Sequence, residues 1–339
     1  MAAGSKHVLL PLSDPQMRGS GGDESLFKGS AMTKRGAVAA VSYMSCAVLL
    51  VLFNKAALSS YNFPCANVIT LFQMISSTLI LFAMRRWKII SFTAAESRTV
   101  SDNHLAGFVS LPTLLHTLPL SLAYLFYMVI CSWCECSMYT TLRRTTVVFT
   151  IIVEYLLTRQ KYSNSVLSSV GLIVFGAFVA GARDMSYDSY GYGVVLLANL
   201  TTAIYLATIA RIGKSSGLNS FGLMWCNGLI CGPVLLLWTY IQGDLTRTMN
   251  FPYLNDCGFQ AVMLVSCILA FFLNYSIFLN TTLNSALTQT MCGNLKDLFT
   301  IGLGWLVFGG LPFDLLNVVG QGLGFFGSGL YAYCKLTGR

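Results

Sequence analysis

The chain has 339 residues, of which 55% are hydrophobic and only 10% are charged. A soluble domain carries roughly 25% charged residues, so this composition excludes an ordinary soluble enzyme or binding module. The net charge of +8 does not indicate a nucleic-acid partner, because the basic residues are spread over many loops rather than gathered in one patch. Lipid is therefore the expected solvent for most of the chain.

The first 34 residues differ from the rest. Residues 1–34 are polar and rich in Gly and Ser, and they contain no apolar run long enough for the core of a signal peptide. We expect them to form a disordered cytosolic tail, because they lack the apolar side chains that a packed core requires.

Ten apolar stretches follow this tail, and polar breaks separate them. A helix needs about 20 mainly apolar residues to cross a bilayer, and these stretches are close to that length. They are Gly36–Phe53, Asn62–Met84, Leu111–Trp133, Met138–Leu157, Val166–Ala182, Tyr190–Ala210, Phe221–Ile241, Phe259–Leu279, Ser285–Phe308 and Phe313–Tyr333. We therefore expect residues 35–339 to form one all-α membrane domain with ten transmembrane helices.

The distribution of Lys and Arg tests the number of spans, because cytoplasmic loops collect these residues. If both termini are cytosolic, fifteen of the 21 Lys and Arg residues lie on the cytosolic side and three lie within spans. Only Lys55, Arg183 and Arg247 lie on the opposite side. This asymmetry favours an even number of spans and two cytosolic termini.

A short internal repeat divides the spans into two groups of five. Phe149-Thr150-Ile151 in the fourth span recurs as Phe299-Thr300-Ile301 in the ninth, at an offset of 150 residues. Many secondary transporters consist of two inverted halves, and an odd number of spans in each half would invert them here. We therefore expect halves at 35–184 and 185–339. Chance similarity between apolar segments is the alternative.

Three cations fall inside predicted spans: Arg143 and Arg144 in the fourth, and Lys296 in the ninth, roughly 18 Å along the helix. A charged side chain at the bilayer centre costs about 2.5–3.5 kcal/mol, so it usually faces a polar cavity and serves a function. Because the repeat pairs these two spans, we expect the cations to face one cavity that binds phosphate. Structural pairing is the alternative, with Glu154 for the arginines and with Asp297 or a backbone carbonyl for Lys296.

Further polar side chains inside the spans, or at their ends, extend this candidate site. Amides and hydroxyls can bind ribose, base and sugar hydroxyls, and tyrosine rings can stack on a base. The residues concerned are Asn54, Lys55, Tyr205, Asn274, Tyr275, Asn284, Ser285 and Thr288. Hydrogen bonding within the helix or to a neighbouring helix is the alternative for each hydroxyl. The glycines of the last two spans, including Gly320 and Gly324, are expected to permit close helix packing.

The sequence carries no motif for catalysis or metal binding. Cys131, Cys134 and Cys136 lack a second pair of ligands, and there is no phosphate-binding glycine loop, nucleophile motif or pair of loop carboxylates. We therefore expect no enzyme activity, no metal and no cofactor. The spans and charges favour a transporter of an anionic solute. A membrane receptor or channel and a membrane-embedded glycosyltransferase are the alternatives.

Two stretches resemble the nucleotide-sugar transporters of the drug/metabolite transporter superfamily. Met138-Tyr139-Thr140-Thr141-Leu142-Arg143-Arg144 is similar to that family's Met-aromatic-x-x-Leu-Arg-Arg motif. The run from Leu273-Asn274-Tyr275 through Asn284-Ser285-Ala286-Leu287-Thr288 to Gly293-x-x-Lys296 is similar to its UDP-sugar branch. The likeness extends over residues 34–339, and it adds Tyr139 and Gly293 to the candidate site.

Within that branch, the UDP-N-acetylglucosamine transporters of the plant Golgi are the most similar group. The stretches that carry this likeness are Phe53-Asn54-Lys55-Ala56-Ala57-Leu58-Ser59-Ser60, Gly181-Ala182-Arg183-Asp184 and Gly217-Leu218-Asn219-Ser220-Phe221-Gly222-Leu223-Met224-Trp225. The resemblance implies exchange of cytosolic UDP-N-acetylglucosamine, or UDP-N-acetylgalactosamine, for lumenal UMP across the Golgi membrane. Other UDP-sugars or a GDP-sugar are the alternative substrates, and the ER membrane is the alternative location.

The expected mechanism follows from this likeness. Arg143, Arg144 and Lys296 would bind the pyrophosphate, while Asn274, Tyr275, Asn284 and Ser285 would read the uridine and the sugar. A UDP-sugar carries two negative charges and UMP nearly two, so the exchange would be close to electroneutral. The expected partners are these two substrates, the lipid bilayer and, as an alternative to a monomer, a second copy of the chain forming a homodimer.

Two segments depart from the patterns of related proteins. GDP-mannose transporters carry Gly-Ala-Leu-Asn-Lys where this chain has Gly293-Asn294-Leu295-Lys296-Asp297, which disfavours a guanine nucleotide. In related proteins an Asn-Val-Pro-like segment precedes the Met-Tyr pair. In this chain Met138-Tyr139 is preceded instead by Ile130-Cys131-Ser132-Trp133-Cys134-Glu135-Cys136-Ser137. The likeness therefore fails at the end of the third span.

Overall fold

The computed structural model describes residues 31–61, 63–93, 109–132, 142–181, 189–308 and 315–338, and within these it is all-helical. One isolated backbone bridge, between Thr93 and Leu218, is the sole extended pairing among them. The predicted tail at 1–34 lies outside the described residues up to position 30, and the first helix begins at Lys34. Tyr139 and the atypical stretch from 133 to 137 also lie outside them.

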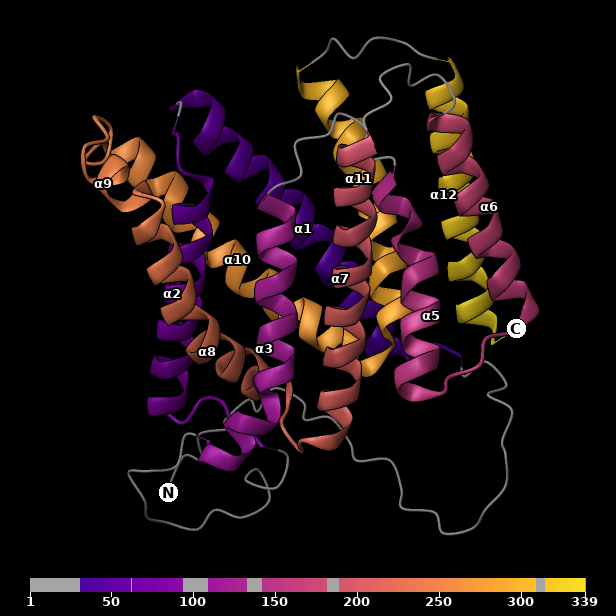
Figure 1. Cartoon of the computed structure of the whole chain (residues 1–339), viewed down its shortest axis with the longest axis horizontal. Helices are drawn as coiled ribbons and strands as arrows, with labels where there is room; N and C mark the ends of the chain where they lie inside the picture. Colours follow the sequence, from indigo (N-terminus) through magenta and orange to yellow (C-terminus); the bar gives the residue numbers. More distant parts are fainter. Residues whose placement is uncertain are drawn as a thin grey trace, which may run out of the picture.

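Ten helices of 13 or more residues account for most of the described chain (Figure 1). They are α1 (Lys34–Ser60), α2 (Ala66–Arg86), α3 (Leu111–Ser132), α5 (Thr146–Thr158), α6 (Asn164–Gly181), α7 (Ser189–Ser215), α8 (Ser220–Ile241), α10 (Cys257–Leu283), α11 (Ala286–Phe308) and α12 (Leu315–Thr337). A 3₁₀ turn, η1 (Arg143–Thr145), precedes α5, and a short helix, α9 (Asp244–Met249), follows α8. Each long helix overlaps one of the ten predicted spans.

Seven of these helices are long and apolar enough to cross a membrane: α1, α2, α3, α6, α7, α8 and α10. The long helices run alternately up and down in Figure 1 and form one bundle. The chain is therefore a multi-pass, all-helical membrane protein. The fourth predicted span differs most from the prediction, because α5 has only 13 residues and the two arginines stand before it in η1.

Helix α9 was not predicted from the sequence. Gly243 has φ 72°, a left-handed conformation that glycine adopts readily. It separates the end of α8 from the start of α9. The Asn67 amide, at the start of α2, donates a hydrogen bond of 3.1 Å to the Asp244 carboxylate. This contact fixes α9 against the end of the bundle that also carries the start of α10.

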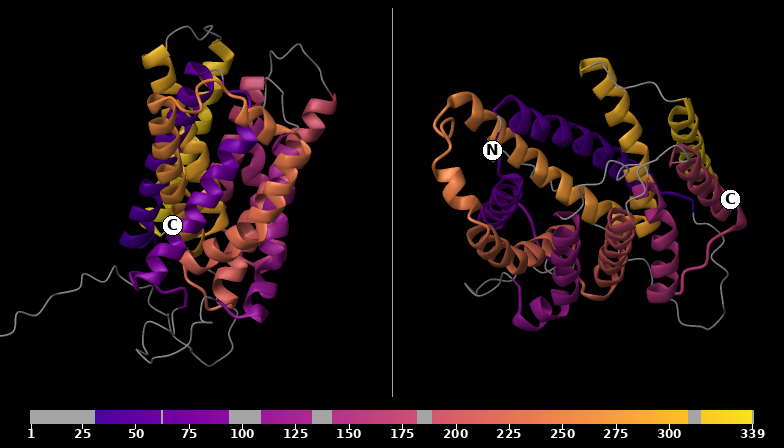
Figure 2. Two further views of the ribbon diagram at one scale, coloured as in Figure 1. Left: turned by 90° about the vertical axis from the view of Figure 1, so that its left-hand side faces the viewer. Right: turned by 45° about the horizontal axis from the view of Figure 1, so that its top comes forward.

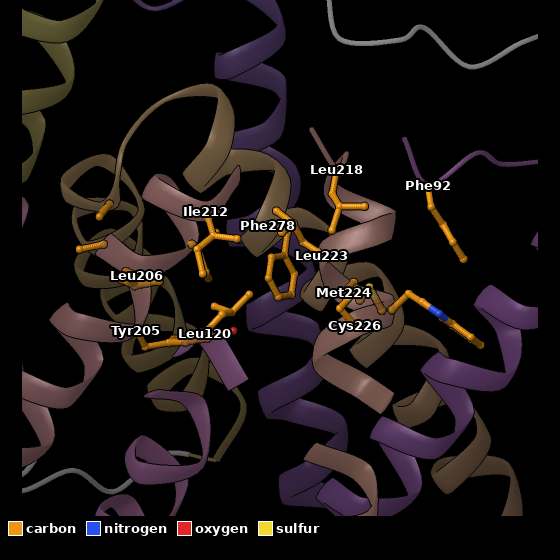
Figure 3. Close-up of a cluster of buried hydrophobic side chains, with 14 of the residues drawn as sticks. Phe92, Leu120, Tyr205, Leu206, Ile212, Leu218, Leu223, Met224, Cys226 and Phe278 are labelled. Carbon is orange, nitrogen blue, oxygen red and sulfur yellow. The ribbon is translucent and has the colours of Figure 1, made fainter. Parts of the chain in front are cut away.

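The largest hydrophobic cluster joins α2, α3, α7, α8 and α10 (Figure 3). Phe278 of α10 is 2% exposed and lies between Ile212 of α7 and Leu223 of α8. Phe92, which follows α2 on the chain, is fully buried and stacks on Trp225 with ring centroids 5.5 Å apart. The loop after α2 is thereby fixed to the start of α8.

Helices α6 and α12 lie side by side at one edge of the bundle in Figures 1 and 2, and glycines bring their backbones together. A Cβ atom added at Gly320 would lie 2.5 Å from the Gly176 carbonyl oxygen and 2.7 Å from the Ala180 Cβ. A Cβ at Gly176 would lie 2.8 Å from the Gly324 nitrogen. The predicted packing role of these glycines is confirmed.

Gly320→Ala is expected to lower the free energy of unfolding by about 1–3 kcal/mol, because the new methyl group must push two backbones apart. Thermal unfolding of the purified protein in detergent measures this loss. Gly322→Ala on the same helix is the matched control, since its Cβ would meet nothing within 4 Å. That control should be neutral or stabilising by up to about 1 kcal/mol. Equal melting temperatures for the two variants would contradict the close backbone contact.

Candidate functional site

The two arginines of the predicted site lie in a 3₁₀ turn, η1, that a residue of α7 holds in place. Asn199 of α7 is 1% exposed, and its amide nitrogen donates 3.0 Å hydrogen bonds to the Leu142 carbonyl and to the Thr145 hydroxyl. The Thr146 hydroxyl, 2.5 Å from the Arg143 carbonyl, also lies 2.8 Å from the Asn199 side-chain oxygen. Because threonine hydroxyls compete with the helical ladder for carbonyls, this segment tightens into η1 instead of continuing α5.

The arginine side chains point to different neighbours. Arg143 donates a 3.2 Å hydrogen bond to the Tyr127 hydroxyl of α3. Arg144 is 4% exposed and donates to the side chain and the carbonyl of Gln321 on α12. The Arg144 Nε atom is buried without a hydrogen-bond partner among the described residues. A buried guanidinium N–H without an acceptor is a position from which an anionic ligand can be bound.

Lys296 lies on α11, and its ammonium group forms a 2.5 Å ion pair with Asp297, the next residue. Asp297 interacts electrostatically with Arg144, and both Asp297 and Arg143 interact with the Tyr43 hydroxyl of α1. Arg143, Arg144, Lys296 and Asp297 therefore lie within electrostatic range of shared neighbours, and we refer to these four side chains as the cation cluster. Of the alternatives left open by the sequence, the pairing of Lys296 with Asp297 is present.

Gly293 lies one helical turn before Lys296, next to this cluster. A Cβ atom at this position would lie 3.7 Å from the Tyr43 hydroxyl, an ordinary contact distance. Tyr205 of α7, which is 8% exposed, stacks on Tyr127 with their rings nearly parallel at 4° and their centroids 6.1 Å apart. Tyr127 also accepts the Arg143 hydrogen bond, so aromatic rings adjoin the cations.

A small cavity of about 20 Å³ opens beside these rings, between α2, α3, α8 and α10. Asn227 and Asn274 line it, together with Tyr124, whose ring centroid is 5.4 Å from that of Tyr205. The Ser77 hydroxyl, also in its lining, is buried with no hydrogen-bond partner among the described residues. The cavity is therefore lined by polar and apolar side chains, and the Tyr124 ring connects it to Tyr127 and Tyr205.

Three predicted site residues lie elsewhere, at the corner between α10 and α11. Asn284 donates to the Gly36 carbonyl at 3.1 Å and to the Asn280 side-chain oxygen at 2.7 Å. The Ser285 hydroxyl accepts a hydrogen bond from the Thr288 backbone N–H, as a helix cap does. The Thr288 hydroxyl lies 2.7 Å from that of Tyr331 on α12. The structure does not bring these side chains together with Lys296, which lies about two turns farther along α11.

The remaining predicted residues are also separate from the cations. Asn54 accepts hydrogen bonds from Gln73 at 3.1 Å and from Ser266 at 2.6 Å, which joins α1, α2 and α10. Lys55, beside it, is exposed at the far end of α1. Tyr275 stacks on Phe221 with centroids 4.3 Å apart. Asn54 and Tyr275 therefore make contacts between helices.

Glu154 of α5, which the sequence offered as a partner for the arginines, lies at the opposite end of its helix. It is 1% exposed and accepts hydrogen bonds from the backbone N–H groups of Ala286 and Leu287, at 3.3 and 3.1 Å, and from the Tyr162 hydroxyl at 2.5 Å. The first turn of a helix has N–H groups without partners and a positive dipole, so a carboxylate is stabilised there. The suggested pairing of Glu154 with the arginines is replaced by this contact with α11.

Sequence reasoning missed several residues of the cluster. Tyr127 and Gln321 accept hydrogen bonds from Arg143 and Arg144, but a single tyrosine or glutamine in an apolar span does not reveal its neighbours. Asn227 was overlooked inside the run Met224-Trp225-Cys226-Asn227, although a buried amide in a span is a signal for a polar contact. Asn199 was not part of the predicted site, because the turn that it binds is 53 residues away in the sequence.

Comparison with known proteins adds four findings. The Triose-phosphate Transporter family model matches residues 34–332. A UDP-N-acetylglucosamine transporter of Arabidopsis thaliana is 66% identical over 98% of this chain and 98% of its own length. A UDP-sugar transporter of Caenorhabditis elegans is 33% identical over 88% of this chain and 89% of its own. A protein of known crystal structure shares the fold with a TM-score of 0.58 at 12% identity, over 87% of this chain and 97% of that one.

Proposed function

Because the chain belongs to the Triose-phosphate Transporter family, we propose that it is an antiporter that carries UDP-N-acetylglucosamine from the cytosol to the Golgi lumen in exchange for UMP. The family and the similar proteins are transporters, and the chain is a transporter rather than an enzyme. The observation that carries the proposal is the series of contacts inside the bundle that runs from Arg143 through Tyr127 to Tyr124, which lines a partly polar cavity.

The chemistry of this cluster suits a nucleotide sugar. Arg143, Arg144 and Lys296 bind the pyrophosphate, since guanidinium and ammonium groups are strong partners of phosphate oxygens. Tyr127 and Tyr205 offer ring faces for the base, and the amides of the neighbouring cavity offer donors and acceptors for ribose and sugar hydroxyls. The 66% identity to a UDP-N-acetylglucosamine transporter supports this sugar among the UDP-sugars, with UDP-N-acetylgalactosamine as the second candidate.

The helix contacts support two equivalent halves, 35–184 and 185–339, within a ten-helix domain. The counterpart of each helix is the one five spans farther along the chain, so the pairs are α1 and α7, α2 and α8, α3 and α10, α5 and α11, and α6 and α12. The contact of α1 with α10 then corresponds to that of α7 with α3, and the contact of α5 with α7 corresponds to that of α11 with α1. The contact of α2 with α10 becomes that of α8 with α3. The pairs α2 with α8, α5 with α11 and α6 with α12 are exchanged within themselves. Such halves, with both termini cytosolic, rock around a central site in an alternating-access cycle.

The exchange is testable in proteoliposomes that contain the purified protein. Preloading the vesicles with UMP is expected to raise uptake of labelled UDP-N-acetylglucosamine at least about tenfold over empty vesicles, because an exchanger turns over only when a counter-substrate returns. Preloading with GMP is the matched control and should leave uptake at background. Uptake that is independent of the internal nucleotide would indicate a channel and refute the antiporter.

A further inference from the structure

We infer that Asp297 sets the net charge of the substrate site and thereby makes it selective for dianionic nucleotides over more highly charged ones. This inference rests on the proposed function, and it concerns which anions the site admits. The starting point is the ion pair between Asp297 and Lys296, with 2.5 Å between the ammonium nitrogen and a carboxylate oxygen.

The ion pair joins two neighbouring residues of α11, which is unusual for a contact that stabilises a fold. Its partners are consecutive residues of one helix, whose side chains leave the helix in different directions. A salt bridge that stabilises a bundle joins two elements, whereas this one joins α11 to itself. Both side chains also keep part of their surface accessible, 21% for Lys296 and 29% for Asp297. The main effect of Asp297 is therefore electrostatic.

The charge of the cluster can be counted from the described residues. Arg143, Arg144 and Lys296 contribute three positive charges. The other described acidic side chains lie elsewhere: Glu154 on the first turn of α11, Asp244 in α9, and Asp256 at the start of α10. Asp297, which forms the ion pair with Lys296, reduces the net charge of these four described side chains to +2.

The proposed substrates match this value. A UDP-sugar carries two negative charges, and UMP carries nearly two because its second phosphate pKa is about 6. Either one would leave the occupied site close to neutral, as a region of low dielectric requires. UDP carries about three charges and UTP about four, so each would leave an uncompensated negative charge in the site.

A charge-neutral replacement of Asp297 tests the inference. The probes are UMP, UDP and UTP, and the measurement is the thermal stabilisation of the full-length protein in detergent at fixed pH and ionic strength, converted to apparent dissociation constants. Asp297→Asn and Asp297→Ser are expected to shift the ratio of UMP to UDP affinity about tenfold in favour of UDP, as the added unit of positive charge predicts. Asp297→Glu keeps the charge and should keep the wild-type ratio.

Two results would overturn the assignment. An unchanged ratio in both neutral variants would show that Asp297 does not tune the charge of the site. Loss of folded protein in both neutral variants, with Asp297→Glu still folded, would make the ion pair a structural requirement instead. A wild-type protein that none of the three nucleotides stabilises would refute the proposed function itself, so the two failures are distinguishable.

Discussion

Lys296→Ala is expected to reduce the exchange of UDP-N-acetylglucosamine for UMP about a hundredfold, to the background of the vesicles. A hydrogen bond from a cation to phosphate contributes roughly 1.5–3 kcal/mol, and the substitution also leaves the Asp297 carboxylate without its 2.5 Å partner. That carboxylate would then repel the pyrophosphate. Proteoliposome uptake with UMP-preloaded vesicles measures the loss.

The matched control for this variant is Lys214→Ala. Lys214 lies in the last turn of α7 and is exposed, so its removal takes away the same charge without touching the cluster. Both variants should elute from a size-exclusion column as the wild type does. Exchange by Lys296→Ala at the wild-type rate would remove this residue from the substrate site.

Glu154→Ala is expected to lower the free energy of unfolding by about 3 kcal/mol. Its carboxylate accepts hydrogen bonds from the first N–H groups of α11 and from Tyr162, and a buried donor that loses its acceptor costs about 1–3 kcal/mol. Glu154→Gln keeps one acceptor oxygen but loses the charge that the helix dipole favours, so about half of this effect is expected. The melting temperature in detergent, read from tryptophan fluorescence, ranks the variants.

Tyr162→Phe isolates one bond of this network and should cost about 1 kcal/mol. Burial and the neighbouring Glu154 carboxylate raise the pKa of Tyr162 well above its ordinary value of 10.0. The hydroxyl therefore remains a donor, and the contribution of the bond should be constant from neutral to mildly alkaline pH. The control is Tyr155→Phe, since Tyr155 follows Glu154 on α5 but is 43% exposed. Equal melting temperatures for Glu154→Ala and wild type would show that the hydrogen bonds between Glu154 and the first turn of α11 do not stabilise the protein.

Most of the fold could be predicted from the sequence, because lipid imposes a simple rule. A run of about 20 apolar residues must become a helix, since every backbone N–H and C=O group in the bilayer needs an internal partner. Each long helix accordingly overlaps a predicted span. The rule says nothing about residues at the membrane surface, where water can satisfy the backbone. That is why α9, fixed by Gly243 and by the bond from Asn67 to Asp244, was missed.

The candidate site was only partly predictable, and the difference lies in the cost of burial. Arg143, Arg144 and Lys296 could be identified because a charge in the bilayer is too expensive to be there without a function. Asn284, Ser285 and Thr288 carry no such cost, since a short polar side chain readily finds a partner. Ser285 caps α11, whereas Asn284 and Thr288 bind residues of α1 and α12. Tyr43, Tyr127 and Asn199 depend on helix neighbours far apart in the sequence, and no local pattern reveals those.

The attachment of the arginine turn to Asn199 also bears on how the protein is made. The turn belongs to the fourth span, whereas its hydrogen-bonding partner belongs to the sixth, so it acquires this support only after the ribosome has completed α7. The helices made before α7 therefore cannot hold the arginine turn through these bonds. Nascent chains that stop before residue 199 are expected to leave the turn unsupported, and membrane quality control should recognise them as incomplete.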